Sequence, residues 1–230
     1  MEVEDRDELC FPQFPNTSCW KPSPPWPPTV TIMLYSMSLI TVVLNLLIII
    51  SISHFRKLHT HTNILLLSLA VTDFVVGLML MPVEVLRKTS CWFLGDYVDG
   101  SGSTYTIVAT IITSASIGTI VLISVDRYVA ICDPLHYTTK VTPKAKKSEL
   151  KAARKLGVLV LGFLMCFAPY YGVIIAGPQL IIESSATFAV HLYYSNSCLN
   201  PVIYAFFYPW FRKAVKQIVT LQILQPGSSE

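Results

Sequence analysis

Long stretches without charge are the feature that most limits what this chain of 230 residues can fold into. The segments without Asp, Glu, Lys or Arg are 22–55, 100–125, 156–182 and 184–211. Each is longer than the roughly 20 apolar residues that a helix needs to cross a bilayer. Charged residues make up only 13% of the chain, about half the share found in soluble proteins. We therefore expect membrane spans rather than soluble domains.

The predicted membrane helices cover residues 30–53, 62–86, 104–129, 156–176 and 183–206. Leu and β-branched residues fill these segments without the alternation of barrel strands, which favours helices. The expected fold class is an all-α membrane protein, a bundle of about five transmembrane helices with an amphipathic surface helix after it. The predicted divisions are an outer segment at 1–28, the bundle at 29–206, and a cytoplasmic amphipathic helix and tail at 207–230.

Lys and Arg in short links indicate the orientation, because they concentrate on the cytosolic side of a membrane. They gather after the first and third predicted spans and in the tail, whereas the first residues are acidic. We therefore expect a multi-pass protein of the plasma membrane with its N-terminus outside. Arg87 and Lys88 are the exception in an outer link, where Asp96 and Asp99 balance them.

The outer segment contains features that suit an extracellular location. Asn16 begins an Asn-Thr-Ser sequence that fits the glycosylation pattern. Cys10 and Cys19 lie where disulfides persist. They are a plausible pair, and Cys91 is then left over in the outer link.

Polar side chains at bilayer depth are costly and often functional. Asp73, Asn45 and Asn200 lie within three different predicted spans, with Asn196 and Ser197 one turn before Asn200. They can form one cluster that holds water or a small cation, or they can simply bond the helices together. No nucleophile–base pair and no His or Cys metal cluster is visible, so we expect neither an enzyme nor a nucleic-acid partner. A channel would need broken or repeated helices that the sequence lacks.

Two motifs close the third and last spans, Asp126-Arg127-Tyr128 and Asn200-Pro201-Val202-Ile203-Tyr204. With Asn45 and Asp73 in the earlier spans, they make the chain resemble a rhodopsin-like G-protein-coupled receptor. The run from Asn196 to Tyr204, followed by Tyr208, Trp210 and Phe211, is similar to the trace amine-associated receptors in particular. Many olfactory receptors of fish belong to that family.

The resemblance implies a receptor that senses a small, amine-like ligand outside and signals to a heterotrimeric G protein inside. The implied sodium and water site comprises Asn45, Asp73, Asn196 and Asn200. The implied G-protein switch comprises Asp126, Arg127, Tyr128, Glu149, Pro201 and Tyr204. The implied ligand-binding residues are Glu84, Ala109, Phe167, Tyr170 and Tyr194. Beyond a structural sodium ion, no cofactor is expected.

The chain departs from that family in three respects. The family has seven spans, and helices four and five are missing after Tyr137. Amine receptors place an Asp in the outer half of the third span, where this chain has Ala109. The family's disulfide Cys is missing near Gly102. An alternative is therefore a truncated, non-signalling form that pairs with full-length receptors. A splice form, a degraded gene and a faulty gene model all remain open.

Overall fold

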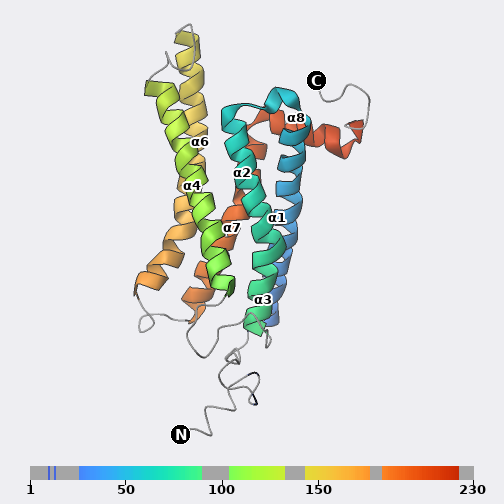
Figure 1. Cartoon of the computed structure of the whole chain (residues 1–230), viewed down its shortest axis with the longest axis vertical. Coiled ribbons are helices and arrows are strands. Elements are labelled where there is room, and N and C mark those ends of the chain that lie inside the picture. The colour runs from blue at the N-terminus through green and yellow to red at the C-terminus, as the bar shows by residue number, and fades with distance from the viewer. Residues whose placement is uncertain are drawn as a thin grey trace.

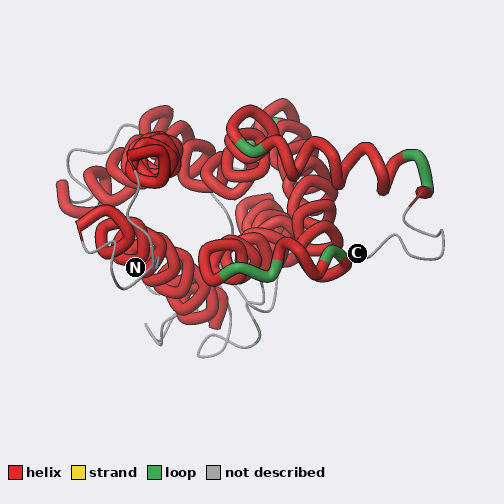
Figure 2. The backbone as a smooth tube through the Cα atoms, turned by 90° about the horizontal axis from the view of Figure 1, so that it is seen from above, coloured by secondary structure: helices red, strands yellow, loops and turns green. Residues whose placement is uncertain are grey.

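The computed structural model describes Cys10, Gln13 and residues 26–89, 104–132, 143–176 and 183–222. Every regular element within these ranges is helical, which confirms the all-α fold class. Most of the helices stand side by side along the long axis, and α8 lies across one end of the bundle (Figures 1 and 2). Their bounds are α1 Pro28–His54, η1 Arg56–Leu58, α2 His61–Val75, η2 Val76–Leu80, α3 Met81–Thr89, α4 Thr104–Cys132, α6 Pro143–Ala176, α7 Glu183–Phe207 and α8 Pro209–Val219.

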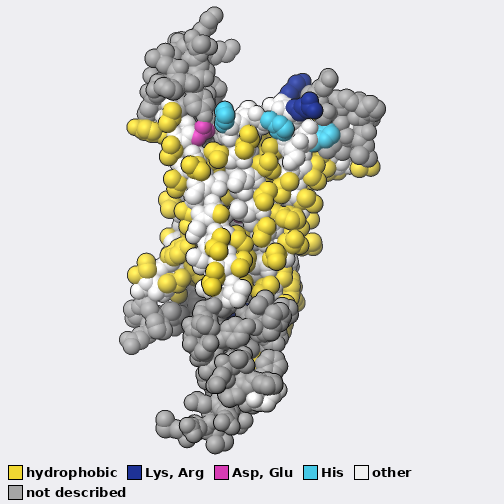
Figure 3. Space-filling model, viewed as in Figure 1, with side chains coloured by type: hydrophobic (Ala, Val, Ile, Leu, Met, Phe, Trp, Pro, Cys, Tyr) yellow, Lys and Arg dark blue, Asp and Glu magenta, His cyan; other side chains and the backbone are white. Residues whose placement is uncertain are grey.

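Four segments of the described chain are long and apolar enough to cross a membrane: Pro28–His54, His61–Thr89, Thr104–Asp126 and Gly157–Ile175. They match the first four predicted spans. The fifth, α7, has a sufficient length of 25 residues, but buried polar residues such as His191, Asn196 and Asn200 make it less apolar. It packs against α1, α2 and α6 inside the bundle. Apolar side chains cover the middle of the visible face, whereas Lys, Arg and His gather at the α8 end (Figure 3).

The second span is interrupted by a π-helical segment, η2, between α2 and α3. The sequence predicted one uninterrupted helix there. The backbone of this segment lies very close to α1, because a Cβ added at Gly77 would lie 3.0 Å from Cγ2 of Thr41. Ser38 on α1 also donates a hydrogen bond to the Gly77 carbonyl oxygen over 2.7 Å. A small residue thus lets two membrane helices approach, as is common in helix packing within bilayers.

The surface helix predicted after the last span is present as α8. Pro209 stands in its first turn, where the missing N–H of proline is tolerated. Phe211 and Ala214 are buried against the bundle, whereas Arg212 and Lys213 are exposed. Arg212 donates to the carbonyl oxygens of Ala205 and Phe206 over 3.1 and 3.0 Å. These bonds satisfy backbone acceptors that the end of α7 leaves open.

An apolar groove lies between α4 and α6. The two helices contact each other directly, α4 also contacts α2, and α6 also contacts α7. α6 begins at Pro143, well before the predicted start of its span. Ile120, Val121, Phe163 and Leu164 help to line the groove, which has a volume of about 530 Å³.

Several predicted features lie outside the described residues. Asn16 and Cys19 are among them, although Cys10 is disulfide-bonded. The backbones of Arg127 and Glu149 lie in α4 and α6, but their side chains are not described. The pairing of Cys10 with Cys19 and that of Arg127 with Glu149 therefore remain predictions.

Candidate functional site

A buried polar cluster joins α1, α2 and α7 in the middle of the bundle. The Asn200 side-chain amide donates to Oδ2 of Asp73 over 2.7 Å. The Asn45 amide donates to the Ser197 carbonyl oxygen over 3.0 Å and to the Thr41 carbonyl oxygen over 2.9 Å. The structure thus brings Asn45, Asp73 and Asn200 into one region. Asn196 is buried one turn earlier on α7, and no hydrogen bond among the described residues joins it to Asp73.

Two oxygens near this cluster have no hydrogen-bond partner within the described part of the chain. They are Oγ1 of Thr41 and Oδ1 of Asn45, and both are buried. A buried polar atom without a partner is costly, so water or an ion commonly satisfies it. Together with the Asp73 carboxylate, these oxygens are the ligand type that hard cations prefer.

The predicted switch residues lie toward the α8 end of the bundle. Asp126 accepts a hydrogen bond from the Thr62 hydroxyl on α2 over 3.0 Å. Tyr128, at 66% exposure, faces away from the core, whereas Pro201 and Tyr204 are buried in α7. The Tyr204 ring meets Tyr208 edge to face, with ring centroids 5.8 Å apart.

A pocket of about 330 Å³ opens between α3, α4, α6 and α7, at the other end of the bundle. Four of the predicted ligand-binding residues line it, namely Glu84, Ala109, Tyr170 and Tyr194. Phe167 does not. It is buried just below, stacked on Phe163 with ring centroids 4.2 Å apart.

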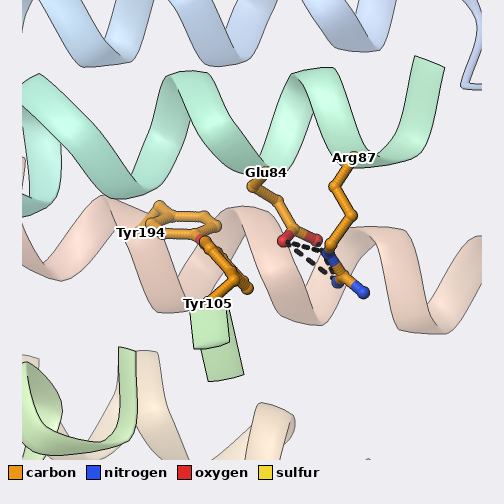
Figure 4. Close-up of polar contacts among 4 residues, drawn as sticks. All are labelled: Glu84, Arg87, Tyr105 and Tyr194. Atoms are coloured by element: carbon orange, nitrogen blue, oxygen red, sulfur yellow. Dashed lines mark hydrogen bonds and ion pairs between the residues drawn. The ribbon is translucent and has the colours of Figure 1, made fainter. Parts of the chain in front are cut away.

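The acid of the pocket is already paired. Glu84 is only 4% exposed, and Arg87 of the same helix forms three hydrogen bonds to its carboxylate over 3.0 to 3.2 Å. The guanidinium carbon of Arg87 also lies 5.2 Å from the ring centroid of Tyr105. The hydroxyls of Tyr105 and Tyr194 are 2.5 Å apart. Figure 4 shows these side chains converging from three helices.

Aromatic rings form the opposite wall of the pocket. Tyr170 and Tyr193 have ring centroids 4.7 Å apart, and Tyr193 meets Tyr194 edge to face at 5.0 Å. The Tyr193 hydroxyl is hydrogen-bonded to Thr113. Phe167 supports this wall from below, with its centroid 5.0 Å from that of Tyr193.

Comparison with known proteins agrees with this arrangement. Residues 44–147 match the family model for the 7 transmembrane receptor (rhodopsin family). Trace amine-associated receptor 1 of Mus musculus is 30% identical to this chain over an alignment 315 residues long. The alignment includes 89% of this chain and 93% of that receptor. Trace amine-associated receptor 13c of Danio rerio is 28% identical, covering 98% of this chain and 96% of that receptor. The chain belongs to the trace amine-associated receptors of the rhodopsin family.

Membership in this receptor family makes the chain a multi-pass membrane protein and not an enzyme. Sequence reasoning missed most of the residues that line the pocket, among them Arg87, Tyr105 and Tyr193. The interval of three residues between Glu84 and Arg87 was a signal, because such residues are neighbours on a helix. Tyr105 and Tyr193 carry no comparable signal, since their contacts come from helices far apart in the chain.

Proposed function

We propose that this chain is a plasma-membrane receptor that binds a small, amine-bearing ligand in the pocket between α3, α4, α6 and α7. The observation that carries the proposal is the combination of a buried acid, Glu84, with a tyrosine-rich wall in a pocket at one end of the bundle. Ammonium groups are favoured by carboxylates and by the faces of aromatic rings. The names of the relatives, which refer to trace amines, support the same ligand class.

We place the N-terminus outside the cell and the α8 end in the cytosol. This orientation is supported by Arg56 and Lys57 in η1 and by Arg212, Lys213 and Lys216 in α8, all at the same end of the bundle. Basic residues in short segments beside membrane spans favour the cytosolic side. The pocket then opens to the outside.

Signalling to a heterotrimeric G protein is proposed to start from the cytosolic ends of α4, α6 and α7. Such signalling requires the helices to exchange between two arrangements. A ligand shifts that equilibrium only by the difference in its affinity for the two arrangements. Two features support a connection between the ends. The α7 helix contains both Tyr194 in the pocket and the buried Pro201 and Tyr204. The Thr62–Asp126 hydrogen bond links α2 to the end of α4 that carries Asp126-Arg127-Tyr128.

We further propose a sodium ion between α1, α2 and α7. The residues present fit such an ion, because the Asp73 carboxylate supplies charge and the unpartnered oxygens of Thr41 and Asn45 supply neutral ligands. Bound there, sodium would neutralise a buried carboxylate and stabilise the arrangement of the three helices. The dependence of thermal stability on sodium, measured on the unaltered chain and on Asn200→Leu, tests this site.

The test of the receptor proposal is ligand-dependent cyclic AMP production in cells expressing this chain. The panel should contain small aromatic amines with and without a second charged group. We expect a response to at least one member. Because Tyr194 lines the pocket and is only 3% exposed, Tyr194→Ala should raise the half-maximal concentration about tenfold or more.

Tyr35→Ala is the matched control, since Tyr35 lies on α1 and is 43% exposed. It should leave the half-maximal concentration unchanged. The signalling proposal fails if no member of the panel gives a response while antibody labelling confirms the chain at the cell surface.

A second candidate is a truncated receptor that pairs with full-length relatives. The apolar groove between α4 and α6 favours it, because membrane helices associate through such packing surfaces. The aligned length of 315 residues, greater than the 230 of this chain, supports the absence of an internal segment. Leu161, Leu164 and Met165 are exposed on α6, and Leu164 lines the groove.

Co-expression tests this candidate. The chain should change the surface level of a full-length trace amine-associated receptor about twofold or more, an effect of the order expected from a modest interaction energy. Val121→Trp, which places a bulky ring in the groove, should abolish the change, whereas Ile32→Trp on the exposed side of α1 should not. An unaltered surface level of the full-length receptor would count against pairing.

A further inference from the structure

We propose that the pocket selects a zwitterion with an ammonium and a carboxylate on the same carbon, as in a free α-amino acid, over a plain amine. The inference rests on the proposed function, because it narrows the ligand class of the same pocket. Its basis is the Glu84–Arg87 ion pair in the pocket wall.

The acid of this pocket does not stand alone. Among the described residues that line the pocket, Glu84 is the one acid, and Ala109 supplies no carboxylate from α4. The Arg87 guanidinium lies within 3.0 Å of the Glu84 carboxylate. Because Glu84 is nearly inaccessible, removing its counter-charge would leave a buried anion uncompensated, which is strongly unfavourable. A plain amine that approaches Glu84 must therefore accept a second cation at close range.

The charge of the lining favours an anionic group. Among the lining residues that the structure describes, Glu84 contributes one negative charge, whereas Arg87 and Lys88 contribute two positive ones. An ammonium ion alone gains little from a wall with this balance, since the attraction of Glu84 is offset by two cations. A carboxylate beside Arg87 and Lys88 would form charge-assisted hydrogen bonds, which are stronger than neutral ones.

The tyrosine wall favours a cationic group at the same time. Arg87 already lies over the ring of Tyr105, so this ring faces positive charge in the structure. Tyr170 and Tyr193 line the same pocket, and aromatic faces attract ammonium groups. An anion without an ammonium would forgo this attraction and that of Glu84.

Only a ligand with both charges uses both parts of the wall. Such a ligand can lie antiparallel to the ion pair, with its carboxylate beside Arg87 and Lys88 and its ammonium beside Glu84 and the tyrosine faces. A ligand with only one charge is attracted by one member of the Glu84–Arg87 ion pair and repelled by the other. The preference then comes chiefly from weaker binding of ligands that lack one of the two charged groups.

The experiment measures binding of three probes to the purified full chain in lipid nanodiscs, by calorimetry or by displacement of a fluorescent ligand. The probes are phenylalanine, phenylethylamine and 3-phenylpropionate, which share a ring and a two-carbon linker and differ in their charged groups. We expect phenylalanine to bind about tenfold or more tightly than either of the others. Equal or tighter binding of phenylethylamine would overturn the proposal, and so would the absence of binding by all three probes.

Two variants in the wall should alter the preference in opposite directions. Arg87→Gln removes the anion partner and releases Glu84, so phenylethylamine should then bind more tightly than phenylalanine. Glu84→Gln removes the cation partner, so 3-phenylpropionate should then bind at least as tightly as phenylalanine. Lys213→Gln removes a cation from the exposed side of α8 and should leave the original order unchanged.

A variant that misfolds would bind none of the probes, so a reversed order cannot arise from misfolding. If Arg87→Gln and Glu84→Gln both bind the three probes with the same order of affinity as the unaltered chain, the ion pair does not determine ligand preference and the proposal is wrong. The comparison of the three probes on the unaltered chain stands independently of both variants.

The result is separable from the test of signalling. If the chain binds phenylalanine in nanodiscs but does not raise cyclic AMP in cells, the zwitterion proposal is supported and the signalling proposal is wrong. A chain that signals in response to phenylethylamine but not to phenylalanine would keep the receptor activity and reject the zwitterion site.

Discussion

Replacing Asn200 by Leu is expected to lower the free energy of unfolding by about 1.5–3 kcal/mol, the range for a hydrogen bond to a charged group. Asn200 donates to Asp73 over 2.7 Å, and Asp73 is only 1% exposed. The substitution leaves the carboxylate buried without this partner, and the surrounding bilayer offers no water to replace it. Thermal and denaturant unfolding in detergent, followed by tryptophan fluorescence, would measure the change.

The control is a double-mutant cycle with Asp73→Leu. If the two residues act through their mutual bond, the double variant should lose less stability than the sum of the single losses. Strict additivity would show that the bond contributes nothing to the fold.

The same variants test the proposed sodium ion. In the unaltered chain, sodium chloride should raise the unfolding temperature more than choline chloride does at equal ionic strength, because a ligand of the folded state stabilises it. Asp73→Leu should remove this difference, and Asn200→Leu should reduce it. An unaltered chain that is equally stable in both salts would rule out the ion.

Gly77→Leu is expected to destabilise the fold by about 1–3 kcal/mol, the usual cost of overfilling a packed interface. A Cβ at this position would lie 3.0 Å from Cγ2 of Thr41 and 3.2 Å from Cγ2 of Val42. The larger side chain must push α1 away from η2, which would also lengthen the Ser38–Gly77 hydrogen bond. The measurement is again thermal unfolding in detergent.

Gly118→Leu is the matched control, because a Cβ added at Gly118 would meet no described atom within 4 Å apart from its chain neighbours and the backbone of its own helix. Both substitutions replace glycine by leucine inside a helical membrane span, Gly77 in η2 and Gly118 in α4, so both gain helical propensity. The difference between the two variants therefore isolates the packing cost. Equal stability of the two would mean that the close contact at Gly77 is not important for folding.

The sequence predicted the helices well, because the length of an apolar run and the position of Pro209 depend only on neighbouring residues. It also singled out Asp73 and Asn200, since charged and amide groups within an apolar run stand out. The π-helical segment η2 could not be predicted in this way. It accompanies the close contact between Gly77 and α1, which brings together residues about 36 positions apart.

The pairing of the charged residues in the pocket was likewise not predicted from the sequence. Glu84 was expected there as an acid for an amine, but its pairing with Arg87 was not, because Arg87 was interpreted as a charge of the outer link. In the structure, α3 continues to Thr89 and therefore includes both residues on one face. The position at which a helix ends thus decided whether Arg87 belonged to a loop or to the pocket.

The way in which α8 is anchored has a practical consequence for anyone who labels this protein. Phe211 of α8 shares a core with Ile48 and Ile52 of α1 and with Tyr204 of α7, so this helix is part of the bundle. A fluorescent protein or an affinity tag should be joined beyond Val219. A fusion joined before Val219 would shorten α8, whose side chains pack against both α1 and α7.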